Sequence, residues 1–283
     1  MKTIDKLSAL PSGSHFERLV YCRVSHAMSI QARRLGQVAH EDSKAARQGT
    51  RIHEALDTGN LEQLSPEECE LFEDLKQQEQ TLLSEWKTDS LPLPERRGEI
   101  RLYLRREGHF LPVLTGQPDL VFVQGTRALI IDRKLGRWRV PDPCENWQLK
   151  IYTALLSQNE RHLQEITVAV QSPFFRYPSY VYTRTELDQL YQSVLVVLSS
   201  LSDPGEPTPG AHWQFCPARL ICPAARNPVY GRPEVYRFGE QNKSSRAGRS
   251  RSGDGLRLGR KFSPVAADKF SAAFRQAYLA TSP

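Results

Sequence analysis

The chain has 283 residues and a formal net charge of +6, from 38 Lys and Arg against 32 Asp and Glu. This length suffices for one large domain with additions or for two small domains. No apolar run approaches the ~20 residues of a membrane-spanning helix, and the N-terminus lacks the apolar segment of a signal peptide. These features argue against an integral membrane protein, and we expect a soluble, cytoplasmic one.

The basic excess is concentrated in one segment. Residues 243–261 hold seven Lys or Arg and one Asp, so this segment carries a charge of +6 and the rest of the chain is formally neutral. Because the segment is rich in Gly and Ser and poor in apolar residues, it cannot bury enough surface to fold alone. We expect a flexible basic arm, whose charge suits an anionic partner.

The composition predicts three regions. One folded domain is expected over residues 1–225, followed by a basic Gly/Ser-rich linker over 226–262 and a C-terminal helix over 263–283. The apolar side of that helix consists of Phe270, Phe274, Ala277 and Tyr278. This side could pack on the folded domain or on a protein partner, and the sequence leaves both open.

The N-terminal part of the chain is expected to be helical. The opening residues form a loop and then a helix that runs toward Ala32, with Cys22 near its start. A second helix spans Gln48–Thr58 and carries His53. Gly49 at its start allows a close approach of backbone or DNA.

A third helix begins after Ser65. Ser65 is a suitable N-cap, Pro66 suits the first turn, and Glu68 completes a capping box. The helix extends to about Trp86, and its apolar residues form one stripe for the core, at intervals of three, four and seven. They are Leu71, Phe72, Leu75, Leu82, Leu83 and Trp86.

Strands occupy the middle of the chain. Strict alternation of apolar residues predicts a strand over Glu99–Arg105. Two adjacent strands joined by a short turn follow over Gly116–Lys134, of which the first delivers Asp119 and the second delivers Asp132. Residues 129–131 are all large and apolar, which is typical of a central strand covered on both faces.

The remaining elements complete an α/β fold. Trp147–Leu156 is expected to form a helix, Glu165–Gln171 and Ser179–Thr183 two strands, and the chain after Thr185 a helix with that residue as its cap. The order of helices, three strands, helix, strands and helix predicts a mixed central β-sheet flanked by helices.

The end of the second central strand is the candidate site. Side chains alternate across a strand, so Asp132 and Lys134 project from one face while Arg133 points to the other. A solvated strand end is the common reason for an Asp-x-Lys sequence. At the end of a buried strand, however, the pair suits a metal site, because carboxylates hold divalent cations and an ammonium can orient a water molecule.

The motifs around this pair resemble a known family. The Gly-x3-His helix ending at His53, the Gly-x-x-Asp segment ending at Asp119, the Asp-x-Lys strand and a Gln-x3-Tyr helix from Gln148 to Tyr152 occur in this order. In this order they resemble the RecB-like branch of the PD-(D/E)XK nucleases, over roughly residues 15–225. The resemblance implies a restriction-endonuclease-like core and a DNA nuclease that depends on Mg²⁺ or Mn²⁺.

The resemblance also implies roles for single residues. His53, Asp119 and Asp132 would bind the metal ion, with the backbone carbonyl of Arg133 as a further ligand, and Lys134 would polarise the attacking water.

Three further residues have two interpretations each. Glu99 resembles the family's first-strand glutamate, or is a solvated strand end. Gln148 and Tyr152 share a helix face, where they could position DNA or hold the lysine strand in place, and a core tyrosine is the plainer explanation of Tyr152.

The cysteines allow a second metal site. The five residues Cys22, Cys69, Cys144, Cys216 and Cys222 are an odd set without a tight framework, so we expect no disulfides. Many RecB-like nucleases hold an iron–sulfur cluster with one cysteine before the core and a Cys-x2-Cys-x5-Cys run after it. Cys22, Cys216 and Cys222 match three of those positions, but Trp213 stands at the fourth. Either His212 or Cys144 substitutes, or the site has decayed into a packed loop.

The sequence therefore predicts a metal-dependent DNA nuclease. We expect an exonuclease that acts in recombination, repair or mobile-element (phage) DNA processing, on DNA that is single-stranded or has ends. The alternative from another class is a catalytically silent nucleic-acid-binding protein, or an iron–sulfur recombination factor, that retains the nuclease fold.

Overall fold

The computed structural model describes residues 10–39, 44–89, 91–92, 94–97, 102–105 and 112–226. Glu99, the basic arm and the expected C-terminal helix lie outside the described residues. None of the described helices is long and apolar enough to cross a membrane.

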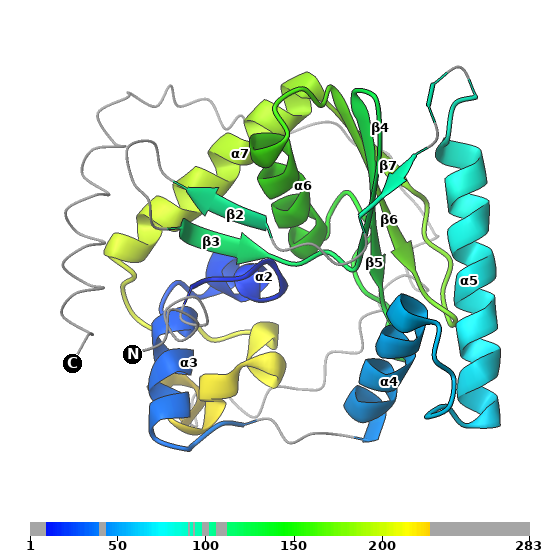
Figure 1. Ribbon diagram of the computed structural model, residues 1–283. Coiled ribbons are helices and arrows are strands. Elements are labelled where there is room, and N and C mark those ends of the chain that lie inside the picture. Colours follow the sequence, from blue (N-terminus) through cyan, green and yellow to red (C-terminus); the bar gives the residue numbers. More distant parts are fainter. Residues whose placement is uncertain are drawn as a thin grey trace, which may run out of the picture.

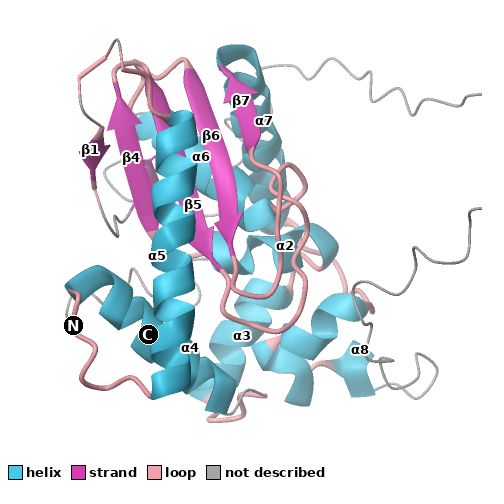
Figure 2. Cartoon of the chain, turned by 90° about the vertical axis from the view of Figure 1, so that its right-hand side faces the viewer, coloured by secondary structure: helices cyan, strands magenta, loops and turns pink. Residues whose placement is uncertain are grey.

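A five-stranded mixed sheet forms the centre of the fold, in the order β1-β4-β5-β6-β7 (Figures 1 and 2). The strands are β1 (Glu95–Arg96), β4 (Leu120–Gln124), β5 (Arg127–Arg133), β6 (Glu165–Gln171) and β7 (Tyr180–Thr183). Only the β5–β6 pair is parallel; the other pairs are antiparallel. The expected mixed central sheet flanked by helices is confirmed.

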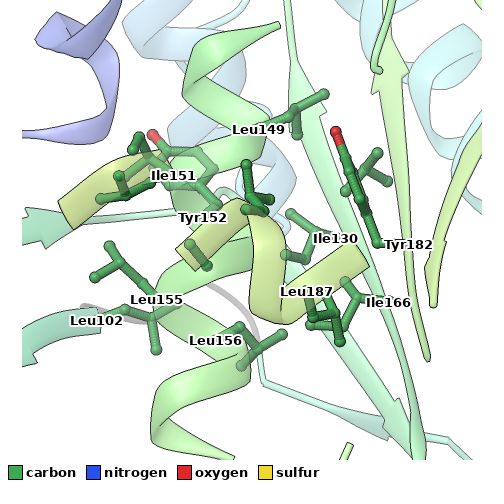
Figure 3. Close-up of a cluster of buried hydrophobic side chains, with 14 of the residues drawn as sticks. Leu102, Ile130, Leu149, Ile151, Tyr152, Leu155, Leu156, Ile166, Tyr182 and Leu187 are labelled. Carbon is green, nitrogen blue, oxygen red and sulfur yellow. The ribbon is translucent and has the colours of Figure 1, made fainter. Parts of the chain in front are cut away.

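Helices cover both faces of this sheet, as the continuous burial of β4 and β5 requires. On one face lie α2 (Gly13–Tyr21), α6 (Trp147–Asn159) and α7 (Arg184–Ser199). The buried cluster between these helices and the sheet includes Leu149 and Leu187 of the helices and Ile130 and Ile166 of the strands (Figure 3). On the other face lies α5 (Pro66–Trp86), which stands in front of the sheet in Figure 2.

The helix α4 (Lys44–Thr58) packs on α5 beside the sheet. Ile52 and Leu56 of α4 and Phe72 and Leu75 of α5 form a separate buried cluster. The predicted capping box of α5 is present, because Ser65 Oγ accepts from the Glu68 N–H and Glu68 accepts from the Ser65 N–H. The helix α4 begins four residues earlier than expected.

A two-stranded sheet of β2 (Leu102–Arg105) and β3 (Pro112–Gly116) lies beside α6. The sequence did not predict β3 as a strand. Gly116 ends it where the backbone comes very close to α6: an added Cβ would lie 2.6 Å from Leu155 Cδ1 and 2.9 Å from Tyr152 Cδ1. The glycine of the Gly-x-x-Asp motif is therefore required for packing against α6.

The expectation of one N-terminal helix toward Ala32 is wrong. Two helices, α2 and α3 (Ser25–Arg34), are separated at Cys22, whose backbone is extended and whose side chain is buried. The break lets α3 turn and pack on the 3₁₀ segment η3 (Pro217–Leu220), as Figure 1 shows. Cys22 therefore lies just after a helix, not near the start of one.

The predicted cap at Thr185 is also wrong, by two residues. Thr183 is the N-cap of α7, and the Glu186 carboxylate accepts from both its N–H and its hydroxyl. Capping requires a residue with extended backbone, and Thr183 has that conformation as the last residue of β7.

The side chain of Arg133 joins three elements of the fold. It projects from the face of β5 opposite Asp132 and is fully buried. Its guanidinium lies 3.0 Å from Asp57 Oδ1 of α4 and 3.1 Å from Glu79 Oε2 of α5. Both helices are thus tied to the end of β5 by charge.

We predict that Arg133→Ala lowers the free energy of unfolding by about 3–5 kcal/mol, because it leaves the largely buried Glu79 carboxylate without its closest partner. Urea denaturation followed by circular dichroism measures this change. The matched control is Glu165→Gln, which removes an ion pair between two partly exposed side chains, Glu165 and Arg127, and should cost under ~1 kcal/mol. Equal losses of stability in the two variants would contradict the structural role of the Arg133–Glu79 ion pair.

Candidate active site

Two carboxylates meet where β4 begins and β5 ends. The antiparallel register pairs Leu120 with Ile131, so Asp119, one residue before β4, lies beside the end of β5. Its Oδ2 accepts a hydrogen bond of 2.6 Å from the backbone N–H of Arg133. The backbone of β5 thus fixes the Asp119 carboxylate next to Asp132.

A hydrogen-bonded network holds Asp132 and Lys134 on the same face of β5. Lys134 Nζ lies 2.7 Å from Asp132 Oδ2 and donates to Gln148 Oε1 at 2.8 Å. The amide nitrogen of Gln148 is 3.1 Å from Asp132 Oδ1 and 2.7 Å from Tyr152 Oη. Gln148 therefore binds both members of the Asp-Lys pair, and Tyr152 binds Gln148. This geometry favours the interpretation in which the Gln-x3-Tyr helix holds the lysine strand.

The helix α4 supplies a third potential ligand. His53 Nδ1 lies 3.8 Å from Asp119 Oδ1, too far for a hydrogen bond, and its side chain is partly exposed. Both residues border a cleft of about 520 Å³. The cleft is lined by Ala46, Gly49, Thr50, His53, Asp57, Asp119, Leu135 and Gly136. Solvent can thus reach His53 and Asp119, whereas Asp132 is buried.

Asp57 was missed by the sequence analysis. It follows His53 by four residues, so the two side chains share one face of α4, and it lines the same cleft. The spacing alone could have indicated this. Its ion pair with Arg133 could not be foreseen, because that contact depends on how α4 packs against the sheet.

The site disfavours ionisation of both Asp119 and Asp132 at the same time. Burial, and next the charge of Asp132, raise the pKa of Asp119 to about 6, against the smaller opposing effects of His53, the Arg133 N–H and Lys134. An ionised Asp119 is therefore costly in the folded chain without a further positive charge. Two carboxylates and one imidazole are donor groups that suit Mg²⁺ or Mn²⁺.

The side chains of His53, Asp119 and Asp132 do not surround a single point in the structure. Across the described ranges, no three His, Cys, Asp or Glu side chains are placed to hold one metal ion. At the candidate site, Lys134 Nζ and the Gln148 amide nitrogen lie against the two carboxylate oxygens of Asp132. The chemistry of the donors fits a divalent cation, and the ion would compete with Lys134 for Asp132.

Three of the four positions expected for an iron–sulfur cluster come together in the structure. Cys22, Cys216 and Cys222 are all buried. Burial raises the pKa of Cys216, against the opposing effects of the Ala218 backbone and Arg18, and the nearby thiols of Cys22 and Cys222 add smaller effects in the raising direction. Cys222 packs with Trp213, which is itself buried, and Cys216 packs with Ala32.

The expected substitutes His212 and Cys144 do not complete a ligand set, since no three His, Cys, Asp or Glu side chains of the described residues are placed to hold one metal ion. His212 stacks on Tyr21 with ring centroids 6.0 Å apart. Cys144 is exposed and lies beside Tyr182, whose hydroxyl is 3.5 Å from the Cys144 carbonyl oxygen. The described residues thus favour the packed-loop interpretation of this segment.

Comparison with known proteins is consistent with the geometry. A family model described as the PD-(D/E)XK nuclease superfamily matches residues 11–223, and the chain belongs to that superfamily. No curated protein sequence matches the chain significantly.

Two solved structures show a similar chain course. A candidate exonuclease from Eubacterium rectale is 12% identical, with 73% of this chain and 86% of that chain covered and a TM-score of 0.43. The protein SSO0001 is 13% identical, with 79% of this chain and 93% of that chain covered and a TM-score of 0.39.

We predict that Asp119→Asn raises the free energy of unfolding by about 3 kcal/mol at pH 8, because it removes a disfavoured charge. The folded wild type holds a proton that the unfolded chain releases between pH about 4 and about 6, so its stability falls as the pH rises through that window. The gain in the variant should therefore shrink as the pH is lowered from 6 to 4. Thermal melts across this pH range measure the effect, and Glu54→Gln, at an exposed position of α4, is the control. A gain in stability that stays constant from pH 8 to pH 4 would contradict the prediction.

Proposed function

We propose that this chain is a divalent-metal-dependent DNA nuclease of the RecB-like branch, which hydrolyses phosphodiester bonds from DNA ends. The observation that supports it best is the Lys134–Asp132 ion pair beside Asp119, with His53 and an open cleft in front. A purely structural strand end gives no reason to gather two acids where their charges repel. The order of motifs along the chain supports the RecB-like branch.

Each residue has a defined task in this proposal. Asp119, Asp132 and His53 would hold Mg²⁺ or Mn²⁺, which supplies positive charge that activates a water and stabilises the phosphate. Lys134 presents its ammonium group beside Asp132, where it orients the attacking water and stabilises the charge that develops on phosphate oxygens. Gln148 keeps Lys134 and Asp132 at a fixed separation, because it hydrogen bonds with both.

The position of the cleft suits a long, charged substrate. It is bordered by α4 on one side and by the segment after β5 on the other, and it is open to solvent. A DNA strand can therefore lie across it with a phosphate at Asp119. The exonuclease activity, the preference for DNA that is single-stranded or has ends, and the role in recombination or repair are parts of the proposal that rest on the resemblance.

The competing function is nucleic-acid binding without cleavage. All four residues His53, Asp119, Asp132 and Lys134 are present and lie at one end of the sheet, which favours catalysis. Under the competing function, substitution of Lys134 would change DNA binding but there would be no cleavage to lose.

We predict that Lys134→Ala reduces DNA cleavage more than 100-fold, a loss of about 2.7 kcal/mol of transition-state stabilisation, while the protein stays folded. The assay uses end-labelled linear DNA and covalently closed circular DNA with Mg²⁺ or Mn²⁺, and circular dichroism verifies folding. Lys87→Ala is the control, because Lys87 is exposed just after α5.

More than a tenth of wild-type activity in Lys134→Ala would refute the catalytic assignment. Degradation of the linear substrate alone would support an exonuclease, and equal cleavage of the circle would show an endonuclease.

A further inference from the structure

The segments after β5 and β6 leave the sheet at the same edge. Because these two strands are parallel, their C-terminal ends lie side by side, and the Lys134 N–H still donates to the Gln171 carbonyl at 2.8 Å. Residues 134–140 follow β5, and residues 172–178 follow β6. Both segments therefore begin at the catalytic end of the sheet.

Three contacts join these segments into one surface. The Arg137 guanidinium lies over the Phe174 ring, 4.9 Å from its centroid, and the Arg139 guanidinium lies over the Tyr177 ring at 5.2 Å. The Val140 N–H donates to Tyr177 Oη at 3.0 Å. The two arginines are thus held by aromatic rings of the other segment.

Trp138 lies between these arginines in the sequence and is 62% exposed. In contrast, Trp86 and Trp213 are buried in the core, at 7% and 3%. A large aromatic side chain that packing does not cover, flanked by two cations, combines the two features that bind unpaired nucleotides: a stacking face and positive charge. We call Arg137, Trp138, Arg139, Phe174 and Tyr177 the Trp138 platform.

The Trp138 platform continues directly from the cleft. Leu135 and Gly136 line the cleft together with His53 and Asp119, and Arg137 is the next residue. The exposed Arg176 adds a further cation on the second segment. Two acids lie nearby: Asp142 is 3.1 Å from Arg139, and Asp74 is 3.6 Å from Arg176. Platform and Arg176 together therefore remain positive, with three arginines against the two carboxylates of Asp142 and Asp74.

We propose that the Trp138 platform binds single-stranded DNA beside the cleaved phosphate, with one base stacked on the Trp138 indole and with Arg137 and Arg139 facing the phosphates. Bases of a duplex are paired and stacked on each other, so their faces are not available to an indole except at an end. The surface thus selects an unpaired strand. This inference rests on the proposed nuclease function for its position in the reaction, but binding can be tested without cleavage.

The test measures binding of a fluorescent single-stranded oligonucleotide to the full chain carrying Lys134→Ala, which keeps the DNA intact. Adding Trp138→Ala should weaken binding roughly 5- to 100-fold, the effect expected for one lost base stack, and Trp138→Phe should retain most of the affinity. Binding to a blunt duplex should change far less. Phe215→Ala is the matched control, because Phe215 is an exposed aromatic residue (55%) in the segment η2 (Ala211–Phe215), away from β5 and β6.

The phosphate contact of Arg137 is tested by the salt dependence of binding. Arg137→Ala should reduce the slope of log affinity against log salt by about 0.7, the value for one phosphate contact on a single strand. Arg161→Ala is its control, because Arg161 is exposed in the turn before β6, at the opposite edge of the sheet. An unchanged slope in Arg137→Ala would refute the phosphate contact.

The outcomes separate this inference from the proposed function. If the wild type cleaves DNA but Trp138→Ala binds the single strand as tightly as Phe215→Ala does, the platform is refuted and the nuclease stands. If the wild type cleaves nothing but Trp138→Ala weakens single-strand binding, the platform stands and the nuclease is refuted. Equal losses for single strand and duplex, or no binding of the single strand at all, would also refute the platform.

Discussion

The buried ion pairs of Arg133 determine how the site is assembled. The guanidinium has no exposed surface and contacts Asp57 of α4 and Glu79 of α5, so removing it would leave the largely buried Glu79 carboxylate without its closest partner. Through Asp57 the same arginine sets the position of α4, which carries His53 to within 3.8 Å of Asp119. Alternation along β5 then places Asp132 and Lys134 on the opposite face, toward Gln148 of α6. One strand end thus connects the helices on both faces of the sheet.

The site contains charge that the fold alone does not favour. The carboxylates of Asp119 and Asp132 repel each other, which contributes to the raised pKa of Asp119, while Lys134 and Gln148 neutralise and orient Asp132. Stability would be greater with fewer acids at this position. Such a conflict is typical of sites that bind a cation or catalyse a reaction, because function rather than packing accounts for the arrangement.

The two ends of the folded domain meet away from this site. Cys22, Cys216 and Cys222 are buried there among apolar groups, with Trp213 packed against Cys222, and the Arg18 guanidinium donates to the Phe215 carbonyl. Bringing these distant segments together costs chain entropy, which the packing of their buried side chains offsets. The cysteines therefore have a structural explanation that does not require iron.

The sequence by itself determined the α/β class, the mixed sheet, most element positions and the candidate residues on β4, β5, α4 and α6. It could do so because periodicity, capping and motif spacing are local. The break at Cys22, the strand β3 and the start of α7 were missed, because they depend on burial and pairing with distant segments. Only the tertiary structure decided that Gln148 holds both Asp132 and Lys134, that Arg133 ties α4 and α5 to β5, and that Trp138 stays exposed beside the cleft. Those facts depend on which faces meet in space, and no spacing along the chain contains that information.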